Sequence, residues 1–240
     1  MPGFATFAVI ATAVVLAALV QGSVGLGFGL VAAPVVTLAD PSLMPGLMIW
    51  LATVLPTLTL LRERRHAQWR GLGWAFAGRV PGTVLGVVVV AVVSAQVLGV
   101  LVGAVVLAAV FLTALVVRLP DRPPVLLGAG LVSGTAGTAV SIDGPPLALV
   151  YQHVTGPQLR ATMSAYFLGG AALSLAGLGL GGQLRAGQFL TAAAMVPFLL
   201  VGFALSGPTR RHVDAGRTRF AVLVVCTLSA LVLVARSVVG

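Results

Sequence analysis

Two charged side chains lie inside long apolar stretches of this sequence, where a charge is costly. Arg79 lies within residues 71–93, and Asp143 is the only acid inside an apolar segment, residues 125–150. An arginine near a bilayer centre costs roughly 2.5–3.5 kcal/mol on insertion scales. Its guanidinium can hold an oxyanion through paired N–H donors, or its long stem can carry it to the headgroups. Asp143 precedes Gly-Pro-Pro, so it can cap a helix start, and it can also exchange protons.

Two clusters of small residues interrupt apolar segments. The first contains four glycines at positions 22, 25, 27 and 29, and the second covers residues 133–141. Glycine costs roughly 1 kcal/mol in a helix interior, so the clusters predict breaks in the helices. Exposed backbone N–H groups, and half-helices starting near Leu30 and Ile142, would favour an anion. Close helix packing would be the favoured explanation of one such cluster, but two clusters in corresponding positions favour a binding site.

Hydroxyl side chains accompany the glycines and can donate hydrogen bonds to an anion, although most membrane serines and threonines bond to their own helix. The predicted anion-binding residues are Ser23, Gly25, Gly27, Gly29, Arg79, Ser133, Gly134, Thr135, Gly137, Thr138 and Ser141, with Asp143 as the candidate for proton coupling.

Catalysis by this chain is not expected. The histidines, at positions 66, 153 and 212, show no metal-ligand spacing with other residues. Ser141, Asp143 and His153 make a poor triad because the first two lie too close in sequence. No Gly-Lys-Ser/Thr follows the glycine runs, so they are not phosphate loops. We therefore predict no catalytic residue, metal or cofactor.

The elements that carry these residues must be membrane helices. Of 240 residues, 59% are hydrophobic and 8% are charged, against roughly 45–50% and 25% in a soluble domain. The apolar segments are too long and too continuous for barrel strands. They cover residues 4–38, 45–61, 71–93, 95–117, 125–150, 159–180, 189–205 and 220–235. The predicted fold class is therefore all-α, a polytopic membrane protein with one domain over residues 1–240.

The basic residues indicate orientation rather than nucleic-acid binding. The net charge is +9, and all 14 basic residues are arginines, clustered mainly in short loops. The positive-inside rule places loops 62–70, 118–124 and 208–219 in the cytoplasm, and loop 181–188 then lies outside. The broken segment 125–150 must enter and leave by the same face, as a re-entrant hairpin or as two crossings.

The two halves of the chain are predicted to be inverted repeats. An offset of 112 aligns Gly22 with Gly134, Gly25 with Gly137 and Pro34 with Pro146. Repeat one covers about residues 4–118 and repeat two about 125–236, each with one broken hairpin and three crossings. Inverted repeats with paired broken helices are typical of secondary transporters that bind substrate at the midplane.

The sequence resembles the sulfite exporter TauE/SafE family over essentially its whole length. The residues that carry the resemblance are Gly22, Gly25, Gly27, Gly29 and Pro34, repeated at Ser133, Gly134, Gly137 and Pro146. The resemblance implies transport of small sulfur-containing anions, such as sulfite or sulfonates, across the cytoplasmic membrane.

We therefore expect a secondary transporter of a small anion in the cell membrane. Its partners are the anionic substrate and the lipid bilayer, with no nucleic acid. A passive anion channel, and a membrane-embedded scaffold or enzyme, are the alternatives. Currents without coupling would identify a channel, and product formation in detergent would identify an enzyme.

Overall fold

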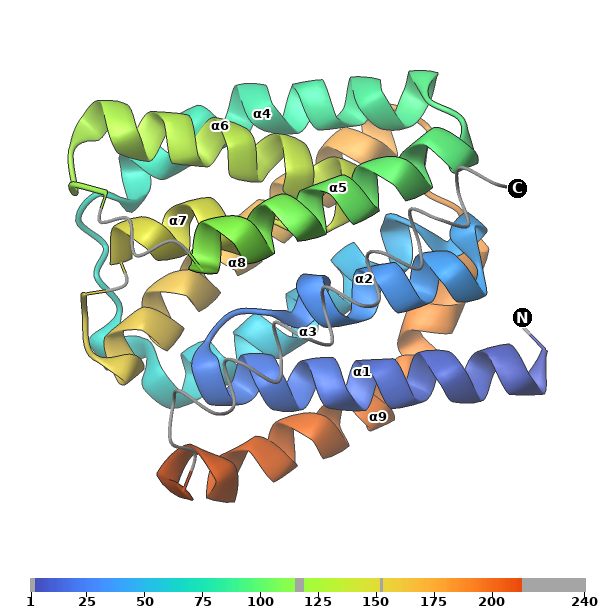
Figure 1. The fold of residues 1–240 in the computed structure, drawn as a ribbon, viewed down its shortest axis with the longest axis horizontal. Helices are drawn as coiled ribbons and strands as arrows, with labels where there is room; N and C mark the ends of the chain where they lie inside the picture. Colours follow the sequence, from blue (N-terminus) through green and yellow to red (C-terminus); the bar gives the residue numbers. More distant parts are fainter. Residues whose placement is uncertain (1–2, 115–118, 152, 213–240) are drawn as a thin grey trace.

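The computed structural model describes residues 3–114, 119–151 and 153–212. The regular secondary structure of these residues is entirely helical, with turns and loops joining the helices (Figure 1). The α-helices are α1 (Phe4–Val24), α2 (Phe28–Ala39), α3 (Gly46–Glu63), α4 (Leu72–Val92), α5 (Ala95–Ala114), α6 (Pro123–Val140), α7 (Gly144–Tyr151), α8 (Gly156–Leu180) and α9 (Ala186–His212). Two short 3-10 helices, η1 (Pro41–Leu43) and η2 (Arg64–His66), flank α3.

Seven helices in the described part of the chain are long and apolar enough to cross a bilayer. They are α1, α3 continued by η2, α4, α5, α6, α8 and α9, with mean hydropathies from 1.2 to 2.6. Helices satisfy every backbone polar group internally, which a lipid environment demands. The predicted all-α polytopic class is thus confirmed. The predicted segment 220–235, and the arginines at 118, 217 and 219, lie outside the described residues.

The first predicted break is present between α1 and α2. Gly25 and Gly27 adopt φ values of 97° and 116°, in the left-handed region that glycine enters at little cost. Gln21 closes this turn, because its backbone carbonyl accepts from the Gly25 amide at 2.7 Å and its side-chain Oε1 accepts from the Phe28 amide at 3.1 Å. The half-helix α2 therefore begins at Phe28, two residues before the predicted start.

The second break lies later in the chain than the sequence predicted. Helix α6 runs without interruption to Val140, so residues 133–140 are helical rather than broken. The turn consists of residues 141–143, with Ser141 at φ 61°, and α7 starts at Gly144. The last residues of α1 and α6, at positions 24 and 140, are 116 positions apart, one helical turn more than the offset of 112 from the glycine alignment.

Helix packing explains why α6 tolerates its glycines. A Cβ at Gly78 of α4 would collide with the Leu127 carbonyl oxygen, and a Cβ at Gly130 of α6 would collide with the Ala75 carbonyl oxygen. Gly134 likewise lies against the backbone of Arg79. Small residues four positions apart let two membrane helices approach closely, and this contact offsets the low helix propensity of glycine.

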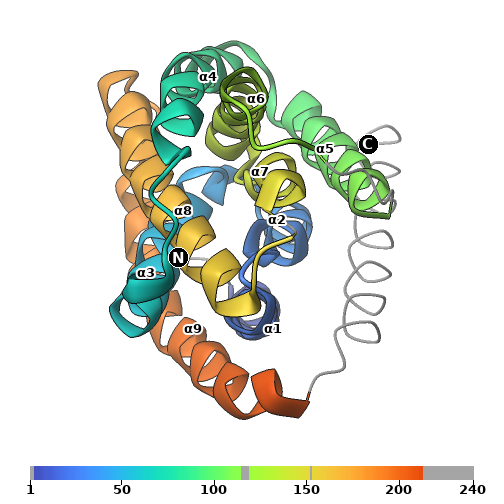
Figure 2. The same cartoon turned by 90° about the vertical axis from the view of Figure 1, so that its left-hand side faces the viewer.

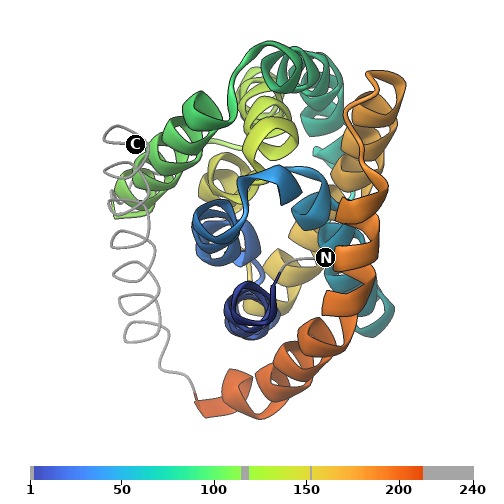
Figure 3. The same ribbon diagram turned by 90° about the vertical axis from the view of Figure 1, so that its right-hand side faces the viewer.

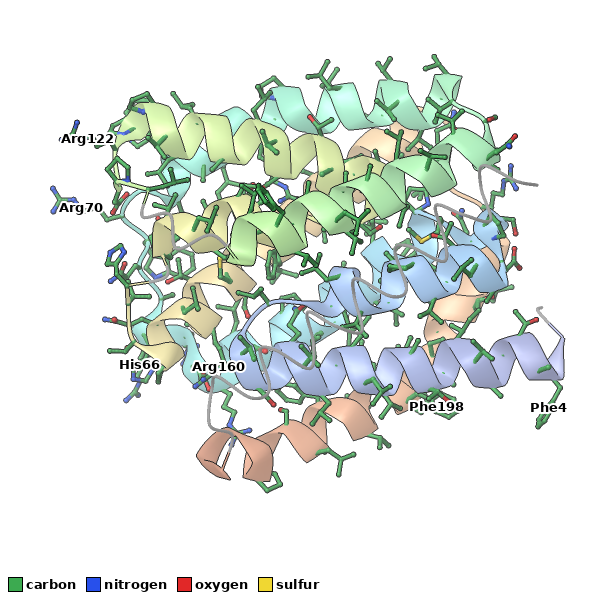
Figure 4. All side chains as sticks on the ribbon, in the orientation of Figure 1. Phe4, His66, Arg70, Arg122, Arg160 and Phe198 are labelled. Carbon is green, nitrogen blue, oxygen red and sulfur yellow. The ribbon has the colours of Figure 1, made fainter. Side chains whose placement is uncertain are left out.

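The two hairpins start at opposite ends of the molecule. Figure 4 shows His66, Arg70 and Arg122 at one end, which we call the arginine-rich end, and Phe4 at the other. Helix α1 starts at Phe4, whereas α6 starts directly after Arg122. Figures 2 and 3, which look along the helices, show α2 and α7 lying between the long helices. Both half-helices are therefore interior elements.

Candidate functional site

The two chain breaks meet inside the molecule. A Cβ built at Gly29 of α2 would collide with the carbonyl oxygen of Ser141, so only a glycine lets the two turns approach this closely. A cavity of about 20 Å³ lies between them, which is room for about one water molecule. It is lined by Gln21, Gly27, Gly29, Leu30, Ser141, Ile142, Asp143, Gly144, Pro145 and Phe167.

A buried ion pair lies at one wall of this cavity. Nη2 of Arg79 is 2.9 Å from Oδ2 of Asp143, and the two side chains are 1% and 22% exposed. The guanidinium also stacks over the Tyr166 ring, with Cζ 4.7 Å from the ring centroid. Arg79 therefore does not extend along its helix to the headgroups, because Asp143 in the turn before α7 and Tyr166 of α8 hold its charged end inside the protein.

Two glycines make room for this ion pair. A Cβ at Gly170 of α8 would collide with the Arg79 guanidinium carbon. A Cβ at Gly137 of α6 would lie 2.6 Å from Cβ of Asp143 and 3.1 Å from Nη2 of Arg79. The sequence singled out Gly137 as an anion contact, and the structure brings it to the two charged groups instead of the cavity lining.

Several polar atoms around Arg79 are buried without a hydrogen-bond partner. They are Nε and Nη1 of Arg79 and the hydroxyl oxygens of Ser133 and Tyr166. The Tyr166 hydroxyl interacts electrostatically with Arg79 and Ser133 but meets hydrogen-bond geometry with neither. An unsatisfied buried polar group costs roughly 1–3 kcal/mol, so such a cluster needs an explanation. The free nitrogens of Arg79 can only donate, and the two hydroxyls can donate as well, so an oxygen-rich anion could satisfy them together.

The predicted residues divide into two groups. Gly27, Gly29, Ser141 and Asp143 line the cavity, and Arg79, Ser133 and Gly137 adjoin it through the ion pair and Tyr166. The other predicted residues make contacts elsewhere. The hydroxyls of Ser23 and Thr135 donate hydrogen bonds to the carbonyls of Leu19 and Leu131, and the Thr138 and Ser174 hydroxyls share a hydrogen bond. Gly25 packs on Arg160, and Gly134 packs on α4. Several residues of the site were not found from the sequence, among them Gln21, Tyr166 and Gly170.

Of these three residues, only Gln21 could have been noticed from the sequence. Gln21 is an amide in an otherwise apolar helix, directly before the first glycine cluster, and such a residue warrants attention. Tyr166 and Gly170 carry no local signal, because an aromatic residue and a glycine are ordinary in a membrane helix.

A second ion pair lies next to the first break. Nε of Arg160 is 2.9 Å from Oε2 of Glu63, and Nη2 of Arg160 donates to Oε1 at 3.0 Å. This pair joins the end of α3 to the start of α8. Gly25 packs directly on it, since a Cβ there would lie 2.7 Å from Cγ of Arg160. Figure 4 shows Arg160 on the side of the molecule nearer the arginine-rich end.

Comparison with known proteins gives one result. The family model described as "Sulfite exporter TauE/SafE" matches residues 10–233 of the chain. No curated protein and no solved structure gives a significant match.

Proposed function

The chain belongs to the sulfite exporter TauE/SafE family, and from this premise we propose that it is a secondary transporter of a small sulfur oxyanion, such as sulfite or a sulfonate, in the cell membrane. Its polytopic helical fold agrees with transport. The observation that carries the proposal is the meeting of two chain breaks around a cavity next to the buried Arg79.

Two observations support an inverted repeat in this transporter. The hairpins α1–α2 and α6–α7 start at opposite ends of the molecule. Their breaks are matched in the chain, since each follows a long helix and precedes a short one. In transporters with this organisation the substrate lies where the paired hairpins meet, and one repeat moves against the other. The cavity between Gly29 and Ser141 is at that meeting point.

The chemistry of the site favours an oxyanion. Arg79 is a buried cation, and its planar N–H donors match the paired oxygens of a sulfonate or sulfite. The Ser133 and Tyr166 hydroxyls add donors from α6 and α8. Asp143 is the ionisable residue that lines the cavity, so we assign proton coupling to it.

The cavity must widen before it admits substrate. A volume of about 20 Å³ holds about one water molecule, and a sulfur oxyanion has at least four heavy atoms. The described conformation is thus an occluded one in the proposed cycle, and movement of α2 or α7 away from the other break would enlarge the site.

Transport is tested with purified protein in proteoliposomes. We expect sulfite or methanesulfonate to accumulate against its gradient when a pH difference is imposed, and to do so faster than in protein-free vesicles. Equilibration that never exceeds the external concentration would identify a channel. Absence of any flux for sulfur oxyanions, from protein that is monodisperse, would refute the proposed function.

A further inference from the structure

Asp143 stands between the cavity and the buried arginine. Its carboxylate lines the cavity and is 22% exposed, whereas Arg79 is 1% exposed and is not part of the lining. Gly137 packs against both side chains, so no other side chain separates them on that side. An anion that enters the cavity therefore meets a carboxylate before it meets the guanidinium.

The surroundings of Arg79 suit more acceptors than Asp143 supplies. Arg79 donates to Asp143 through Nη2, but its Nε and Nη1 and the hydroxyls of Ser133 and Tyr166 meet hydrogen-bond geometry with no partner. These three side chains are at most 1% exposed. Two oxygens of one carboxylate cannot satisfy these donors, whereas three oxygens of a sulfonate or sulfite can accept from several of them at once.

We propose that Asp143 is a tethered competitor of the substrate: its carboxylate occupies on Arg79 the position that the transported oxyanion takes, and the two exchange. This inference rests on the proposed function. A proton from the bulk solution adds to Oδ2 of Asp143, which ends the ion pair, and a substrate oxygen replaces Oδ2 as the acceptor of Nη2. Ser133 and Tyr166 then donate to the remaining substrate oxygens, so binding takes up one proton.

Two features of the site make the exchange necessary. The cavity holds about one water molecule, so an oxyanion gains room only when the carboxylate leaves its present position. Two anions on one guanidinium would also repel each other in this low-dielectric site, and a proton on the carboxylate removes that repulsion.

The pH dependence can be assigned because few other groups titrate nearby. Among the described residues, Arg79 from α4 and Tyr166 from α8 are the ionisable groups that interact with Asp143. The lining residues from α1, α2 and α7 and their turns include no other ionisable side chain. Arginine and tyrosine do not change charge between pH 5 and 8 at their ordinary values.

Binding of methanesulfonate, which stays a monoanion over this range, is measured in detergent between pH 5 and 8. We expect the apparent Kd of the parent protein to fall on acidification by up to about tenfold per pH unit, the limit for uptake of one proton. Asp143→Asn should bind more tightly than the parent at pH 8, with a Kd that does not change with pH. Glu63→Gln, which alters the other ion pair, is the matched control and should keep the parent's slope.

A second measurement needs no variant. Calorimetric titrations of the parent protein in two buffers of different ionisation enthalpy report the protons taken up per methanesulfonate bound. We expect one proton, and none would overturn the exchange.

The failures of the two proposals are distinguishable. An Asp143→Asn protein that keeps the parent's affinity and slope would overturn the exchange, while flux in proteoliposomes would still support transport. Absence of both binding and flux in the parent would instead refute the transporter, and the exchange with it.

Discussion

At the scale of single residues, Arg79 is tolerated inside the protein because three neighbours compensate its burial. Asp143 neutralises the charge at 2.9 Å, the Tyr166 ring faces the guanidinium, and Gly170 leaves the space it occupies. Removing one partner of a buried pair costs on the order of 3–5 kcal/mol, because the other charge is left uncompensated. Apolar residues of similar volume often stabilise a fold as well as a buried ion pair does, so we propose that this pair serves binding.

Substitution of Arg79 tests that role. We expect Arg79→Ala to weaken binding of a sulfur oxyanion by about 100-fold, because it removes charge-assisted hydrogen bonds worth roughly 1.5–3 kcal/mol each. Arg79→Lys should weaken binding by about tenfold, since lysine keeps the charge but lacks the planar pair of donors. Equilibrium binding in detergent measures both changes. Parental affinity in Arg79→Ala would remove Arg79 from the site.

At the scale of elements, two kinds of glycine contact shape this molecule. Glycines of α4 and α6 let two long helices pack backbone to backbone, while Gly29 lets the two breaks touch. The first kind concerns stability and the second concerns the site. Substitution can separate them, because each has a control glycine with free space around it, on the same helix for the first kind and on the other hairpin for the second.

The helix contact is tested at Gly78. We expect Gly78→Ala to lower the melting temperature in detergent, because its Cβ would collide with the Leu127 carbonyl and force α4 away from α6. Gly73→Ala, on the same helix with nothing within 4 Å of its Cβ, should leave the melting temperature nearly unchanged. Equal effects of the two substitutions would contradict the packing argument.

The contact between the breaks is tested at Gly29. A Cβ there collides with the Ser141 carbonyl, so we expect Gly29→Ala to separate the two turns and to lower the transport rate at least tenfold. Gly128→Ala in α6, whose Cβ meets nothing within 4 Å, is the control and should transport at the parent's rate. Both rates are measured in proteoliposomes at equal amounts of reconstituted protein. A parental rate for Gly29→Ala would show that the breaks need not touch.

At the scale of the whole molecule, the distribution of arginines and the course of the helices are consistent with one orientation. His66, Arg70 and Arg122 share one end, and α8 has 25 residues, enough to carry the chain from Arg160 to the opposite end. We therefore propose that loop 181–185 faces the other side of the membrane from the arginine-rich end, as an inverted repeat would require.

Cysteine labelling in intact cells tests this orientation. In a Cys226→Ser background, we expect a membrane-impermeant thiol reagent to label Gln183→Cys and to leave His66→Cys unlabelled until the cells are opened. The reason is that arginine-rich loops remain in the cytoplasm. Labelling of His66→Cys in intact cells, with none at Gln183→Cys, would reverse the orientation. Labelling of both would contradict a single inverted repeat.

Composition and local pattern determined the class of this protein without any structure. Apolar runs of about 20 residues satisfy their backbone polar groups only as helices in lipid, so hydropathy alone predicts seven of the observed elements. The first break was predictable because Gly25 and Gly27 adopt a conformation that other residues avoid. The special character of Arg79 and Asp143 was also visible, since any charge in such a segment is unusual.

Tertiary structure alone decided which of these residues act together. The second break lies at residues 141–143, later than predicted, because α4 packs on the glycines of α6 and keeps that helix intact. Local sequence patterns do not show which helix will pack against a glycine. The pairing of Arg79 with Asp143, and the contributions of Tyr166 and Gly170, bring α4 together with the turn before α7 and with α8, both of which lie far from α4 in the chain. Helix propensity and hydropathy are properties of short windows, whereas the contacts that build the site depend on which helices become neighbours.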